Sequence, residues 1–182
     1  MPCAIVVVDM LNEFLHGRAE QLLVPAENVP GLIANVRALV DRARRAQVPV
    51  VYVACAHDEG DLIFRAIRPH ALRGTWEAQI VADLAPAPGE WVVEKKVYDG
   101  FYETRLDALL RGLAVDELYL AGAQTDCCVH ATGQGAIFRG FRAHIVAECT
   151  DTINAERQRV GLERYRDLIG PVVHLSDPAL GF

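Results

Sequence analysis

Three apolar runs of the chain end in residue types that can do acid–base or nucleophilic chemistry. Asp9 closes the first run, Lys95 and Lys96 close a later one, and the adjacent Cys127 and Cys128 follow a third. A cysteine attacks as its thiolate, so a cation must lower its pKa from about 8.5, and a carboxylate must accept its proton. An acid, a cation and a thiol in one place therefore suit attack on an amide or a similar carbonyl.

The double cysteine raises the question of which thiol reacts. Cys128 precedes an apparent helix, whose N-terminal dipole and free N–H groups favour an anion. The N–H groups of the turn 122–128 also suit an oxyanion hole. Another interpretation is structural, because buried cysteines are common and inert, a strand-end aspartate often caps a loop, and lysines are usually solvated.

The elements that must position these residues follow from hydrophobic periodicity. Val-rich runs predict strands, and amphipathic stretches predict helices. The expected strands are 4–10, 49–55, 90–95, 117–122, 142–148 and 171–175, and the expected helices are 28–47, 74–84, 104–115, 128–140 and 155–170. In the first long helix, Asn28 is the expected cap and Pro30 lies in the first turn.

This alternation predicts a single-domain α/β protein over 1–182. We expect a Rossmann-like three-layer fold with a parallel sheet of five to six strands and helices on both faces. Ligands of such sheets bind beyond the carboxyl ends of the strands, where the acid, the lysines and the thiols lie.

The composition of the chain argues against several classes of function. The chain has 182 residues, 52% hydrophobic and 23% charged residues and a net charge of -6, which argues against nucleic acid or an anionic membrane as the main partner. Five scattered cysteines are no disulfide framework, so we expect a reduced, cytoplasmic protein. The first apolar run follows no basic leader and is too short to cross a membrane, so we expect no signal peptide and no transmembrane segment.

The order of three segments resembles the isochorismatase-like cysteine hydrolases, which include nicotinamidases. The segments are "IVVVDMLNEF", "EKKVYDGFYETRLDALL" and "AGAQTDCCVHAT". The resemblance implies that Asp9 is the acid/base and that Lys95 is the catalytic lysine, with Lys96 as the alternative if the register shifts by one. It also implies that Cys128, which Val129 follows directly, is the nucleophile, while Cys127 occupies a variable position.

The resemblance extends to the rest of the site. It implies a cis peptide between Ala123 and Gln124 and an oxyanion hole from the N–H groups of Gln124 and Cys128. Phe14 is expected to line the substrate pocket, and we add Trp76 and Phe101 as candidate substrate-binding residues. The expected partners are a small-molecule amide and further copies of the chain in a dimer or tetramer.

The implied activity is hydrolysis of a small amide through a thioester, with no cofactor needed for the triad and nicotinamide as the first candidate. A carbamoyl or ureido amide is the alternative substrate. Two other classes stay open, namely a redox thiol protein and a ligand-binding module, although a vicinal cysteine pair is poorly placed for an ordinary disulfide.

A metal site beside the triad is the remaining question. Nicotinamidase-type relatives carry Asp-x-His after the second strand and a further His before a short helix. The matching positions here are Cys55, His57 and His70, so a thiol replaces the carboxylate. Cys and two His are acceptable zinc ligands, but the loss of the oxygen ligand disfavours iron or manganese. The other interpretation is that both histidines only line the pocket or form hydrogen bonds.

Overall fold

A computed structural model describes residues 2–180 and 182, and its centre is one six-stranded, all-parallel sheet in the order β3-β2-β1-β4-β5-β6. The strands are β1 (Cys3–Val8), β2 (Val50–Cys55), β3 (Trp91–Lys95), β4 (Glu117–Ala123), β5 (Arg142–Asp151) and β6 (Val172–Val173). This is the strand order of a doubly wound nucleotide-binding-type sheet, so the expected α/β class is confirmed.

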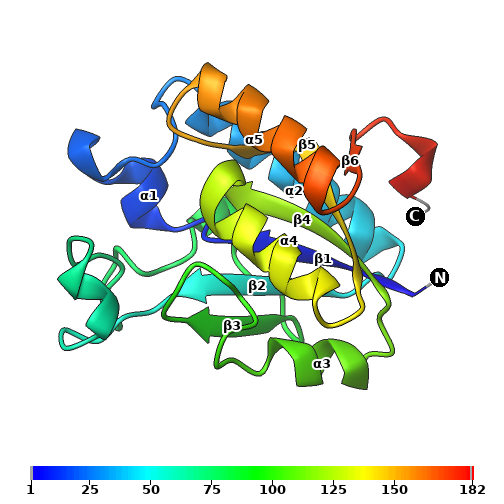
Figure 1. The fold of residues 1–182 in the computed structure, drawn as a ribbon, viewed down its shortest axis with the longest axis horizontal. Coiled ribbons are helices and arrows are strands. Elements are labelled where there is room, and N and C mark those ends of the chain that lie inside the picture. Colours follow the sequence, from blue (N-terminus) through cyan, green and yellow to red (C-terminus); the bar gives the residue numbers. More distant parts are fainter. Residues whose placement is uncertain (1, 181) are drawn as a thin grey trace.

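Helices cover both faces of the sheet (Figure 1). They are α1 (Asn12–His16), α2 (Val29–Arg45), α3 (Leu106–Gly112), α4 (His130–Ile137) and α5 (Ala155–Leu168). Short 3₁₀ turns are η1 (Ala19–Gln21), η2 (Leu62–Arg65), η3 (Ala82–Leu84) and η5 (Pro178–Leu180), and the π-helical turn η4 (Thr125–Val129) leads into α4. None of the described helices is long and apolar enough to cross a membrane.

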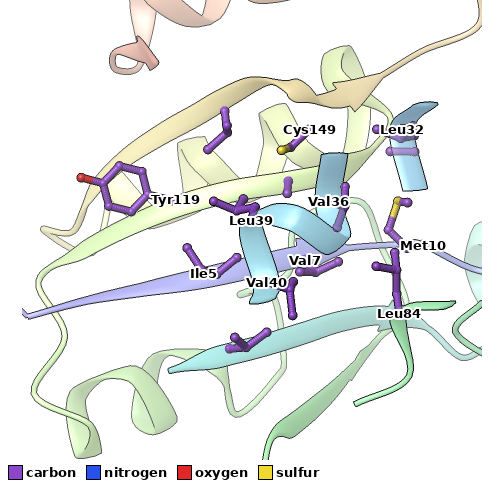
Figure 2. Close-up of a cluster of buried hydrophobic side chains, with 14 of the residues drawn as sticks. Ile5, Val7, Met10, Leu32, Val36, Leu39, Val40, Leu84, Tyr119 and Cys149 are labelled. Atoms are coloured by element: carbon purple, nitrogen blue, oxygen red, sulfur yellow. The ribbon is translucent and has the colours of Figure 1, made fainter. Parts of the chain in front are cut away.

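Helix α2 covers one face of the sheet. Its residues Leu32, Val36, Leu39 and Val40 recur at helical spacing and are buried against strand residues such as Val7 (Figure 2). Each such side chain contributes about 1.5–3 kcal/mol when it is fully buried. The amphipathic pattern of this segment therefore translates directly into the packing of the first layer.

Helices α3, α4 and α5 cover the other face. Leu106 and Leu110 of α3, Ala136 of α4 and Tyr165 of α5 lie in one buried cluster with the alternate strand residues. Gly133 lets α4 approach α5, because a Cβ there would lie 2.5 Å from the Tyr165 ring. Strands β1, β2 and β4 are thus buried on both faces, which explains their continuous apolar sequences.

The helix expected over 74–84 is wrong. Apart from the short turn η3, the backbone there bonds to the segment after β1: Asn12 N–H donates to Gln79 O at 2.9 Å, and Val81 N–H donates to Met10 O at 3.0 Å. Ile80 forms an isolated bridge with Leu11. Tertiary pairing has therefore replaced the intrahelical bonds that the local sequence favours.

Several element ends also differ from expectation. Asn28 has helical dihedrals and no capping bond; its side chain donates to Asp151 at 2.9 Å instead, while Pro30 lies in the first turn as expected. The strand expected over 142–148 continues to Asp151, and the helices α1 and η2 lie in segments where no helix was expected. Apart from the longer β5, these differences lie outside the strands, where the periodic signal is strongest.

Candidate active site

Asp9, Lys95 and Cys128 meet at the carboxyl ends of the strands. Asp9 follows β1, Lys95 ends β3, and Cys128 lies in η4 directly after β4. Lys95 Nζ lies 2.7 Å from Asp9 Oδ2, and it donates to Cys128 Sγ at 3.5 Å and to Val97 O at 3.1 Å. Since β1 and β4 are neighbours where the strand order reverses, the trio occupies the crevice at the topological switch point.

The turn that carries the thiol has an unusual backbone. The peptide bond between Ala123 and Gln124 is cis, as the resemblance implies. Gln124 O accepts bonds from the N–H groups of both Cys127 and Val129 at 3.1 Å. Gly122 comes just before, with φ of +115°, and a Cβ there would lie 1.9 Å from Val8 O. Only glycine therefore lets β4 end this close to β1.

The charges of the site are balanced. Burial opposes the ammonium form of Lys95, yet the Asp9 carboxylate and the nearby sulfur groups of Cys128 and Cys55 outweigh burial and raise the pKa of Lys95 well above its usual value. The hydrogen bond to Cys127 and burial raise the pKa of Cys128, although Lys95 opposes both. The same hydrogen bond lowers the pKa of Cys127. Lys95 is therefore the neighbour that favours the thiolate form of Cys128.

The doubled lysine separates into two environments. Lys95 is fully buried beside the thiol, whereas Lys96 lies outside with its Nζ 2.5 Å from Asp58 Oδ2 and 2.7 Å from Asp61 Oδ1. Adjacent strand residues point to opposite faces, so only one of them can face the crevice. The geometry therefore places Lys95, not Lys96, next to Asp9.

Cys55, the last residue of β2, is a further member of this buried group. Its backbone N–H donates to Asp9 Oδ1 at 2.8 Å, and its Sγ accepts from Lys95 Nζ at 3.0 Å. Burial and the charge of Asp9 raise the pKa of Cys55 to about 12. Cys55 is therefore a neutral thiol that helps to hold Asp9 and Lys95 in place.

His57 and His70 lie beside Cys55 with defined ring orientations. His57 Nδ1 lies 3.1 Å from Asp61 Oδ2, and His70 Nδ1 lies 3.0 Å from Arg68 O. Both partners are acceptors, because the hydrogen bond from Lys96 helps to lower the pKa of Asp61 to about 2 and a carbonyl has no proton. Both Nδ1 atoms therefore carry hydrogen, and Nε2 is the ring atom of each histidine that these contacts leave unused.

This donor set fits a zinc ion. One ligand atom from each of Cys55, His57 and His70 lies within 4.8 Å of the others, and the buried His57 Nε2 has no hydrogen-bond partner among the described residues. A carboxylate behind a histidine ligand is also the usual second partner in zinc sites. One adjustment is needed, since Cys55 would have to lose its proton to bind the metal.

These residues border a cavity of about 200 Å³. Its described lining residues are Asp9, Phe14, Leu23, Cys55, His57, Ile63, Ile67, Arg68, His70, Val97, Tyr98, Gln124, Cys127 and Cys128. The volume suits a small metabolite, and the aromatic and aliphatic wall is typical of a ligand site. Asp9, Cys128 and the candidate metal residues thus face one space.

Of the three expected substrate-binding residues, only Phe14 lines this cavity. Phe101 is 3% exposed and stacks on Phe141 with ring centroids 5.8 Å apart, so it belongs to the core. Trp76 is 52% exposed, on the segment that pairs with the residues after β1. We correct both assignments: an aromatic residue near a motif does not by itself reveal which way its side chain points.

Sequence reasoning missed several lining residues. Tyr98 follows Lys95 by three residues, and Ile63, Ile67 and Arg68 come from the irregular segment between β2 and β3. This segment has no sustained period, so no hydrophobic pattern marks the side chains that face the cavity. The sequence feature that could have indicated a role in the cavity is the position of this segment directly after the end of β2.

Comparisons with known proteins agree with this geometry. A family model described as Isochorismatase domain matches residues 3–177. Ureidoacrylate amidohydrolase RutB of Agrobacterium fabrum is 30% identical over 170 residues, covering 81% of this chain and 75% of that protein. Nicotinamidase 3 of Arabidopsis thaliana is 30% identical over 160 residues, covering 84% and 75%. The crystal structure of N-carbamoylsarcosine amidase from Thermoplasma acidophilum has a TM-score of 0.88 and 31% identity, covering 97% and 98%.

Proposed function

The chain belongs to the isochorismatase family, and from this premise we propose that it is a cysteine-dependent hydrolase of a small-molecule amide. The observation that carries the proposal is the position of Lys95, whose ammonium group contacts both Asp9 and Cys128 at the wall of the cavity. A redox thiol or a simple binding protein would not need a buried lysine–aspartate pair beside its cysteine.

The proposed reaction starts with the protonated thiol. As Cys128 Sγ bonds to the substrate carbonyl carbon, its proton passes to Asp9, and Lys95 balances the negative charge in the crevice. The raised pKa of Cys128 fits a proton that leaves only during the attack. The N–H groups of Gln124 and Cys128 donate to the oxyanion.

The second half of the reaction reverses these roles. Asp9 gives its proton to the leaving nitrogen, the C–N bond breaks, and a thioester on Cys128 remains. Asp9 then accepts a proton from water, whose oxygen attacks the thioester carbon. Asp9 returns this proton to the departing sulfur of Cys128, so that the acid is released and the free thiol is regenerated. Cys55, His57 and His70 would hold a zinc ion, which when bound supplies a Lewis-acid contact for a polar group of the substrate.

Two classes of amide follow from the relatives. The name of the bacterial relative, ureidoacrylate amidohydrolase, indicates a ureido substrate, and the plant relative is a nicotinamidase. Ureido compounds and simple carboxamides both release ammonia when this site attacks their carbonyl. We therefore propose ammonia release from a panel of both classes as the test of function.

The panel is run on the purified protein and on Cys128→Ala. We expect the wild-type protein to release ammonia from at least one panel member and the variant to release none. Covalent trapping of substrate carbon on Cys128, detected by mass spectrometry after acid quench, would support the thioester. Equal activity of both proteins would contradict a cysteine mechanism.

A further inference from the structure

Arg68 is the only lysine or arginine among the described residues that line the cavity. The only carboxylate in that lining is Asp9, which Lys95 already neutralises at 2.7 Å. The wall around Arg68 is apolar, with Ile63, Ile67 and Phe14. A ligand in this space therefore meets neutral polar groups on Tyr98 and Gln124 and one guanidinium group, that of Arg68.

The guanidinium group of Arg68 has donors available. Its side chain is 47% exposed, and its one ion pair joins Nη1 to Glu13 Oε1 at 3.5 Å. Both oxygens of Glu13 already accept shorter bonds, Oε1 from Gln21 at 2.8 Å and Oε2 from the Ala71 N–H at 2.6 Å. Within the described part of the chain, the Arg68 side chain donates no hydrogen bond that meets normal geometry.

We propose that Arg68 binds a carboxylate at the end of the substrate opposite the scissile amide. The substrate class is thus a small ureido or amido acid rather than a neutral carboxamide. This inference rests on the proposed function and makes it more specific, since the triad alone has no preference for what lies beyond the carbonyl.

A carboxylate fits better than a phosphate. A guanidinium fork matches the two oxygens of a planar carboxylate with two parallel hydrogen bonds. A phosphate carries up to two charges, and the nearby Glu13 would repel the second one with no further cation in the lining to offset it. One cation in a cavity of about 200 Å³ therefore favours a single compact anionic group.

The test uses two matched pairs of compounds that differ only in the charged end. One pair is 3-ureidopropionate and propylurea, and the other is succinamate and butyramide; each neutral partner has a methyl group in place of the carboxylate. Two quantities are measured, the ratio of kcat/KM for acid over neutral compound from ammonia release, and the same ratio of affinities by calorimetry in the Cys128→Ala background.

We expect the wild-type ratio to favour the acid by about 10- to 100-fold, the range for hydrogen bonds to a charged group. Arg68→Met should bring the ratio close to one, mainly through KM, and Arg68→Lys, which keeps the charge but loses the fork, should be intermediate. Arg65→Met is the matched control, because this exposed arginine precedes Arg68 by three residues and does not line the cavity. Thermal unfolding checks that each variant is folded.

The outcomes separate this inference from the proposed function. Hydrolysis of amides without any preference for the acids would overturn the role of Arg68 and leave the hydrolase standing. Binding of the acids that depends on Arg68, without hydrolysis of any amide, would overturn the hydrolase and support the carboxylate site. A preference that disappears with a chelator but persists in Arg68→Met would assign the carboxylate to a metal at His57 and His70 instead. Absence of binding of both acids would also overturn the inference.

Discussion

Lys95 and Asp9 form an ion pair with 2.7 Å between Nζ and Oδ2, and neither side chain is exposed to solvent. Removal of one partner leaves the other charge buried, which is strongly destabilising, whereas removal of both is much better tolerated. The pair therefore links the stability of the fold to the chemistry proposed for it.

We predict that Lys95→Met lowers both activity and stability. Turnover should fall at least 100-fold, and the free energy of unfolding should fall by about 3–5 kcal/mol because Asp9 loses its partner. The double variant Asp9→Asn/Lys95→Met should regain much of the stability but no activity. Lys96→Met is the matched control and should retain most of the turnover, since Lys96 is exposed and donates to Asp58 and Asp61. A larger loss in Lys96→Met would contradict the assigned register.

The two adjacent cysteines should behave differently. Cys128→Ala is expected to abolish turnover, because only this thiol of the two accepts a hydrogen bond from Lys95. Cys127→Ala should keep most of it, although loss of the shared hydrogen bond removes one cause of the raised pKa of Cys128. Alkylation with peptide mapping provides the check: substrate should protect Cys128. Protection confined to Cys127 would reverse the assignment.

Zinc binding gives a third prediction. Protein that is stripped with a chelator and then equilibrated with Zn²⁺ should take up about one equivalent, since Cys, His and His with one open position form a common zinc site. His70→Ala should lose this uptake, and Asp61→Asn should weaken it about 10- to 100-fold by releasing His57. His174→Ala, an exposed histidine far along the chain, is the control. Uptake that is equal in all variants would show that the metal lies elsewhere.

A fourth prediction concerns the pH dependence of stability. Glu90, before β3, accepts bonds from Arg44 of α2 at 2.8 and 2.9 Å and from the Ala87 N–H at 2.7 Å. Burial opposes the charged form, but these bonds outweigh it and lower the pKa of Glu90 below its usual 4.5. The stability that the charged Glu90 side chain adds to the fold is therefore fully present above pH 4.5. It is lost as the pH falls through the lower pKa that Glu90 has in the folded protein.

Glu90→Gln should accordingly cost about 1–3 kcal/mol at pH 7 and less at pH 3, measured by urea unfolding at both values. Glu156→Gln is the control, since its pair with Arg159 lies in solvent and should leave stability unchanged. A cost of Glu90→Gln that does not shrink in acid would show that packing, not charge, holds this contact.

The central part of the fold could be predicted because its signals are local. The Val-rich strand expected over 4–10 and the amphipathic helix expected over 28–47 correspond to the observed β1 and α2. The positions of Asp9 and Lys95 also follow, because residues at the ends of parallel strands meet on one edge of the sheet.

The surroundings of the site could not be predicted, since they depend on long-range pairing. The segment around Trp76 has a helical pattern, yet its backbone bonds to residues 10–13. Phe101 lies near Lys95 in sequence but packs on Phe141 in the buried core. Arg68 belongs to no periodic element, so its place in the cavity appears only when the chain is folded.

The sheet and the segment after β2 supply different parts of the site, and this separation affects how substrate choice can change. The strand ends carry Asp9, Lys95 and Cys128, whereas one connection, from His57 to His70, supplies Ile63, Ile67, Arg68 and both imidazoles to the cavity wall. This connection begins and ends at the parallel bridge between His57 and Leu72. This connection can therefore be replaced as one segment. Substrate choice can then change, in evolution or by engineering, while Asp9, Lys95 and Cys128 keep their positions.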